Sequence, residues 1–156
     1  MKHGIAIVAV MVILLSCNTA TDTAKPEKAK LPIEGTWELI SGATITKNDT
    51  VITDYTKDQK MIKIINGTHF AFLKHDPDKG KDSAKAIYES GGGSYSLVDS
   101  QYTEHLDFCN YREWEGHTFQ FTVAINNDTL TQRGIEKLEN LGIDRVIIET
   151  YVLVKK

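Results

Sequence analysis

Glu104 is the residue of this sequence whose neighbours point most clearly to chemistry. It alternates with apolar residues along a strand-like segment, so that Tyr102, Leu106 and Phe108 share its face. If this face points inward, the carboxylate is buried and must be protonated, paired or hydrogen-bonded. By the same alternation, the expected partners are Tyr95, Gln132 and, if the last strand turns that way, Tyr151.

This polar set has two interpretations. It is either an anchor that orients a ligand in an otherwise apolar cup, or a structural network that fixes the register of the strands. Glu149 joins the set only if its face of the last strand points inward, and a pair of Glu104 and Glu149 would then suggest acid–base catalysis. We expect a protein that is not an enzyme, and the sequence contains no nucleophile elbow, P-loop or dinucleotide fingerprint.

For the other residues that could bind a metal or react, a structural or surface role is the better explanation. The histidines outside the N-terminal segment are scattered and lack the close spacing of zinc ligands. The aspartates of segment 75–85 faintly resemble a calcium loop, but lysines interleave with them and the distal Glu is missing, so we expect a charged hairpin tip. Cys109 has no nearby base and is expected to be a small buried hydrophobe. We predict neither a metal site nor a cofactor.

The N-terminus predicts where the protein resides. A basic start is followed by an apolar run from Gly4 to Leu15 that is too short to span a bilayer comfortably. Leu14 and Ser16, just before Cys17, resemble the lipobox of bacterial lipoproteins. We therefore expect residues 1–16 to be a signal peptide and Cys17 to be acylated, with palmitate among its acyl chains. The expected location is the cell envelope, lipid-anchored at the outer membrane.

A polar segment separates this anchor from the folded part of the chain. Residues 17–34 include Pro26 and Pro32 and have little to bury, so they are expected to form a flexible tether. The net charge of −3 gives no electrostatic footprint for nucleic acid. With Cys17 acylated, Cys109 has no intramolecular partner and no disulfide is expected.

From Gly35 onward the sequence predicts short alternating strands separated by turn residues. Asn66-Gly67 between two apolar runs is a strong hairpin signal, and Asn126-Asn127-Asp128 is a comparable turn. Hairpins of this kind place strands next to each other in chain order. The eight expected strands lie near residues 35–46, 60–65, 68–74, 86–98, 102–111, 117–126, 129–133 and 145–154, with a ninth if the glycines at 91–93 break one of them.

Several of these strands have one apolar face, and the apolar faces need a common interior. Trp37, Leu39 and Ala43 share one such face, and Phe119, Phe121, Val123 and Ile125 share another. An all-β, eight-stranded antiparallel up-and-down barrel buries them without leaving open edges. Ile135, Leu138 and Leu141, followed by Gly142, predict one short helix of two turns before the last strand.

Gly35-Thr36-Trp37 opens the first expected strand, and His69-Phe70, the run at 91–97 and segments 102–104 and 116–130 follow it. On these residues the barrel domain, residues 35–156, resembles the lipocalins, with their Gly-x-Trp motif, and specifically lipocalin-like (calycin) bacterial lipoproteins. The resemblance implies a barrel whose Trp plugs the closed end and which binds small hydrophobic molecules. Their pattern also places an Arg against this Trp after the last strand, whereas Arg145 precedes the last strand here.

The sequence therefore predicts a membrane-anchored protein that binds a small hydrophobic ligand, such as a lipid or fatty acid, inside the barrel. The alternative is a structural or interaction module of the envelope whose barrel is filled by its own side chains. The candidate ligand-binding residues are Trp37, Phe70, Tyr95, Tyr102, Glu104, Phe119, Phe121, Gln132 and Tyr151.

Overall fold

The computed structural model describes residues 31–47 and 49–155. This part of the chain is all β apart from two short 3₁₀ turns, η1 (Arg112–Trp114) and η2 (Glu139–Leu141). No helix in it is long and apolar enough to cross a bilayer. The strands are β1 (Gly35–Thr46), β2 (Asp49–Asp54), β3 (Lys60–Ile65), β4 (His69–His75), β5 (Tyr88–Val98), β6 (Gln101–Cys109), β7 (Thr118–Asn126), β8 (Thr129–Leu138) and β9 (Ile143–Leu153).

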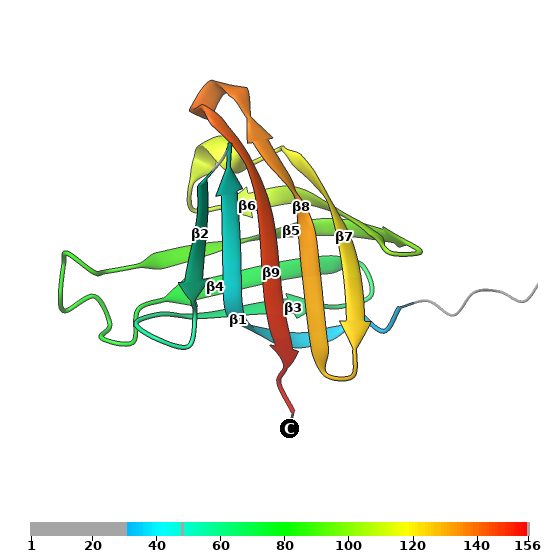
Figure 1. Cartoon of the computed structure of the whole chain (residues 1–156), viewed down its shortest axis with the longest axis horizontal. Coiled ribbons are helices and arrows are strands. Elements are labelled where there is room, and N and C mark those ends of the chain that lie inside the picture. The colour runs from blue at the N-terminus through cyan, green and yellow to red at the C-terminus, as the bar shows by residue number, and fades with distance from the viewer. Residues whose placement is uncertain (1–30, 48, 156) are drawn as a thin grey trace, which may run out of the picture.

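The predicted antiparallel barrel is confirmed. From β3 to β9 each strand pairs with the next one in the chain, and β1 closes the barrel by pairing with both β3 and β9. In Figure 1, β1, β9, β8 and β7 run along the front wall, and β3 to β6 cross behind them. The closed ring has eight strands, and β2 is an additional strand.

The additional strand β2 was not expected from the sequence. It pairs with residues 41–46 of β1, whereas β3 pairs with residues 35–38 on the same side of β1. The two strands therefore lie one after the other along β1, separated by residues 55–59. The ninth strand comes from this interruption and not from the glycines at 91–93, because β5 runs through them without a break.

Two bulges reverse the alternation of inward and outward side chains, and because of them the predicted inward positions of Ala43 and Phe108 are wrong. A bulge between Leu39 and Ser41 places Gly42, and not Ala43, opposite the inward-facing Glu149. A second bulge, where Gly92 and Gly93 pair across to β6, turns Phe108 outward and buries Cys109. Gly93 is required here, because a Cβ at this position would overlap the backbone oxygen of His105.

A short helix does precede the last strand as predicted, but it is the single 3₁₀ turn η2 and not a helix of two turns. Strand β8 continues to Leu138, and only η2 is helical before β9 begins. Ile135 is exposed on this strand, so its spacing with Leu138 and Leu141 does not define a buried helical face. Gly142 does follow the turn in a left-handed conformation, with φ of 65°, as its predicted capping position requires.

Trp37 is buried at the end of the barrel opposite η2, where it pairs with Leu153 of β9. Its side chain is 1% exposed, and its indole N–H donates a hydrogen bond of 2.8 Å to the backbone oxygen of Ile33. Ile33 is itself buried in the core, so the last residues of the expected tether pack onto the barrel. The predicted signal peptide, the acylated Cys17 and residues 17–30 of the tether lie outside the described residues.

Candidate functional site

A cavity of about 460 Å³ opens into the barrel at the end that carries η1 and η2, at the top of Figure 1. Ligand-binding cavities in proteins generally have volumes of about 300–1,000 Å³. Its wall is rich in ionisable side chains: three cations, Lys63, Lys74 and Arg145, and four carboxylates, Glu89, Glu104, Glu136 and Glu149. Aromatic rings complete the wall, among them Tyr55, Phe72, Tyr111, Trp114, Phe121 and Tyr151.

The deepest ion pair joins Lys63 of β3 to Glu104 of β6. Lys63 Nζ lies 2.8 Å from Glu104 Oε1, and the two side chains are 3% and 10% exposed. Lys63 also donates a hydrogen bond of 3.0 Å to Gln132 Oε1. Its ammonium lies within 5.8 Å of the ring centroids of Phe70, Tyr102 and Tyr151, which is cation–π distance. Glu104 is therefore buried and paired, but its partner is Lys63. Of the partners expected from the sequence, Tyr95 donates to Asn66, Tyr151 donates to Glu149, and Gln132 reaches Glu104 only through Lys63.

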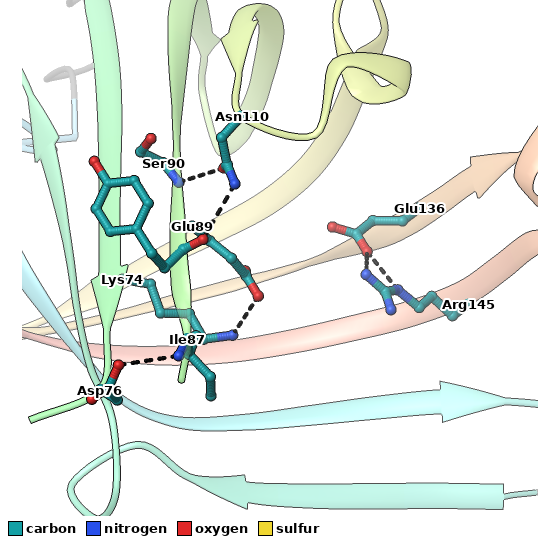
Figure 2. A network of polar contacts seen from close by, with 9 residues as sticks. Lys74, Asp76, Ile87, Glu89, Ser90, Asn110, Glu136 and Arg145 are labelled. Atoms are coloured by element: carbon teal, nitrogen blue, oxygen red, sulfur yellow. Dashed lines mark hydrogen bonds and ion pairs between the residues drawn. The ribbon is translucent and has the colours of Figure 1, made fainter. Parts of the chain in front are cut away.

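Two further ion pairs lie nearer the mouth of the cavity and are drawn in Figure 2. Lys74 and Glu89 face each other across β4 and β5, with Nζ 3.0 Å from Oε1. Arg145 and Glu136 face each other across β8 and β9, with both Nε and an Nη of Arg145 2.6 Å from Glu136 Oε2. Both pairs are direct cross-strand neighbours, so the register of the sheet brings them together.

Glu149 is the remaining carboxylate of the wall. Tyr151 donates a hydrogen bond of 2.7 Å from its hydroxyl to Glu149 Oε2, and Gln132 Nε2 lies 3.3 Å from the same oxygen. Burial raises the pKa of Glu149, although Lys63 and the Tyr151 hydroxyl act in the opposite direction. The last strand thus turns its Glu149 face inward, the orientation that the sequence left open.

Tyr55 contributes to the wall from the segment that separates β2 from β3. Burial, and secondarily the charge of Glu149, raise the pKa of Tyr55 to about 12, so its hydroxyl is protonated at neutral pH. Lys74 Nζ lies 5.7 Å from the centroid of its ring. The segment between β2 and β3 thus places an aromatic hydroxyl donor at the cavity.

Four of the nine candidate ligand-binding residues line the cavity: Glu104, Phe121, Gln132 and Tyr151. The other five belong to the packed part of the barrel. Trp37, Phe70 and Phe119 are buried in the core, and the ring of Tyr95 packs against that of Tyr102 at a tilt of 50°, with ring centroids 5.2 Å apart. The Tyr102 hydroxyl is buried and has no hydrogen-bond partner among the described residues.

Sequence reasoning missed most of the charged wall. Lys63 alternates with Met61 and Ile65 on the inward face of β3, and this parity, together with the need of Glu104 for a cation, could have identified it. Glu136 was missed because its segment was predicted to be helical, whereas it belongs to β8. Lys74, Glu89 and Arg145 could be found only from the register of their hairpins. The sequence left open whether any residue takes the role of the Arg that lipocalins place against their Trp. Arg145 lies within β9 and packs over Trp114, 5.7 Å from its ring centroid.

The histidines, the aspartate-rich loop and Cys109 contribute nothing to this site. Among the described residues, no group of three His, Cys, Asp or Glu side chains is arranged to hold a metal ion. Asp76 closes the loop between β4 and β5 by accepting hydrogen bonds from the backbone N–H groups of Gly80 and Ile87, and these bonds lower its pKa. Cys109 is buried as predicted, and burial raises the pKa of its thiol.

Comparison with protein-family models gives no match for this chain. Comparison with curated protein sequences also gives none.

Proposed function

We propose that this protein binds one small molecule in the barrel cavity without catalysing a reaction. The observation that supports the proposal is the 460 Å³ cavity, which opens at one end and combines aromatic rings with a few fixed polar groups. This combination is typical of sites that fix the orientation of a small ligand. The ion pairs hold Lys63, Lys74 and Arg145 in place, so the wall is organised before a ligand enters.

The charges of the wall favour an amphipathic ligand over the wholly apolar one expected from the sequence. A purely apolar molecule would displace water from Glu149 and from the ion pairs and give them no hydrogen bonds in return. A ligand with an apolar part and a polar head would contact the aromatic rings and still satisfy the carboxylates. A short-chain lipid amphiphile meets this description.

The proposal includes the lipocalin-like family and the lipid anchor. The closed meander barrel and the position of Trp37 at its plugged end support the family resemblance. The motif around Cys17 supports acylation and an envelope location. An anchored barrel of this kind would hold its ligand near the membrane surface.

A barrel that binds nothing is the second candidate, and a specific observation favours it. The half of the barrel around Trp37 and Tyr102 is filled by buried side chains, so only the other half holds a cavity. Such a module would use the outer surface and leave the cavity to water.

Thr44→Trp is expected to distinguish the two candidates. Thr44 lines the cavity opposite Ile147, and an indole at this position would occupy part of the volume. We expect at least one of octylamine, octanol and octanoate to bind the wild-type protein with one-to-one stoichiometry in calorimetric titrations. The substitution is expected to weaken this binding at least about tenfold, or ~1.4 kcal/mol.

Ile45→Trp is the matched control, because Ile45 is the neighbouring residue of β1 and pairs with Val146 on the outer face. It should leave the affinity unchanged. Binding that is equally insensitive to both substitutions would place the ligand outside the cavity. No binding of any of the three amphiphiles would favour the filled or water-holding barrel.

Cys17→Ala is expected to abolish lipid anchoring. Cys17 is the acceptor that the N-terminal motif predicts, and several acyl chains would contribute about 0.8 kcal/mol per buried CH₂. In a bacterial host fed labelled palmitate, the wild-type protein should be labelled and should sediment with membranes. The variant should carry no label and be released from the membrane fraction. Cys109→Ala is the control, and loss of label in this variant would contradict the assignment.

A further inference from the structure

The cavity wall has one more carboxylate than it has cations. Three of the four carboxylates are paired with one cation each: Glu104 with Lys63, Glu89 with Lys74, and Glu136 with Arg145. Among the described residues, no ion pair includes Glu149. If all seven groups are ionised, the wall carries one negative charge that the chain itself does not neutralise.

The hydrogen bonds of Glu149 leave one of its oxygens available. The bonds from Tyr151 and Gln132 both end on Oε2, and no donor among the described residues is paired with Oε1. Glu149 lines the cavity and is half-buried, so a ligand in the cavity can reach this carboxylate. A charge-assisted hydrogen bond to Oε1 would be about twice as strong as a neutral one.

We infer that the ligand of the cavity is an organic cation, with an ammonium group that pairs with Glu149. The inference rests on the proposed function and specifies the chemistry of the ligand. A bound cation would complete a fourth ion pair in the wall and would favour the ionised form of a carboxylate that burial disfavours. The rest of the ligand would contact Phe72, Phe121 and Tyr111, cavity rings over which no cation of the described residues lies.

A metal ion or an anion fits the same wall less well. No group of three potential metal ligands exists among the described residues, so Glu149 offers a metal too few protein ligands. An anion would have to take Lys63, Lys74 or Arg145 away from its glutamate and leave that glutamate unpaired.

The test compares octylamine, octanol and octanoate, which share one alkyl chain and carry a positive, a neutral and a negative head group. Titration calorimetry with the folded wild-type protein is expected to give an affinity for octylamine at least about tenfold higher than for octanol, with octanoate the weakest. Glu149→Gln keeps the shape of the side chain and removes its charge. It is expected to bring the octylamine affinity down to that of octanol and to leave the octanol affinity unchanged.

Glu139→Gln is the matched control, because it removes the same charge from an exposed position in η2. It should leave the preference for octylamine intact. Octanol or octanoate binding as tightly as octylamine in the wild-type cavity would overturn the cationic ligand and leave small-molecule binding standing. Binding of none of the three would overturn both.

Discussion

Lys63→Met is expected to destabilise the barrel by about 3–5 kcal/mol. Lys63 and Glu104 are the most deeply buried ion pair of the described residues, with side chains 3% and 10% exposed. Removing the cation leaves Glu104 without a charge partner inside the barrel, and an uncompensated buried charge costs far more than the pair contributes when intact. Lys63 also lowers the pKa of Glu149, so its loss would disfavour a second ionised carboxylate. The free energy of unfolding in urea measures the effect.

The double variant Lys63→Met with Glu104→Met is the informative partner of this experiment. It removes both charges and keeps the volume of the side chains, so most of the lost stability should return. Lys57→Met is the control, because Lys57 pairs with Asp54 on the surface, where the side chains are 76% and 47% exposed. That change should lower the free energy of unfolding far less than Lys63→Met does, because solvent screens an exposed pair. A similarly small cost for Lys63→Met alone would show that the buried carboxylate is satisfied by other means.

Trp37→Ala is expected to have an effect of similar size, about 3–5 kcal/mol. The side chain of Trp37 is 1% exposed and belongs to the packed core, so its removal leaves a cavity that the surrounding strands cannot fill completely. The substitution also leaves the buried oxygen of Ile33 without its indole donor. A lower midpoint of urea unfolding with an unchanged slope would be the observed result.

Trp37→Phe separates the two contributions, since it keeps much of the ring and removes only the N–H donor. It should cost about 1–3 kcal/mol, the penalty for a buried acceptor left without its partner. Trp114→Ala is the control at the opposite end, where Trp114 is half-buried in η1 beside the cavity. An effect of Trp114→Ala equal to that of Trp37→Ala would contradict the larger contribution that burial assigns to Trp37.

Residue types and local spacing were enough to predict the eight strands of the closed ring and their order, but not the additional strand β2. Asn66-Gly67 forms the hairpin between β3 and β4, and Asn127 adopts the positive φ of 53° that its turn requires. The alternation of Phe119, Phe121 and Val123 predicts the buried face of β7 correctly. These features depend on neighbouring residues along the chain, which is why the sequence alone reveals them.

The predictions were wrong where one local sequence pattern is compatible with two structures. Ile135, Leu138 and Leu141 have helical spacing, but pairing of β8 with β9 through Leu138 provides backbone hydrogen bonds that the short helix would not. The positions of Ala43 and Phe108 were wrong because a bulge adds one residue and reverses every face after it. The glycines at 91–93 are compatible with the second bulge, but the amino-acid types do not specify the residue at which the register shifts.

Only part of the candidate site could be predicted from the sequence. The sequence by itself determined that the chain makes an antiparallel barrel and that Trp37 lies at the start of the first strand. It also showed that Glu104 shares a face with apolar residues and needs partners if that face points inward. Only the tertiary structure decided which partners: Lys63 reaches Glu104 from a strand 41 residues away, and Arg145 reaches Glu136 across a register that η2 sets. The alternation along a strand specifies which side chains share a face. The register and the closure of the sheet decide which side chains of different strands lie close together, and ion pairs form only between such side chains.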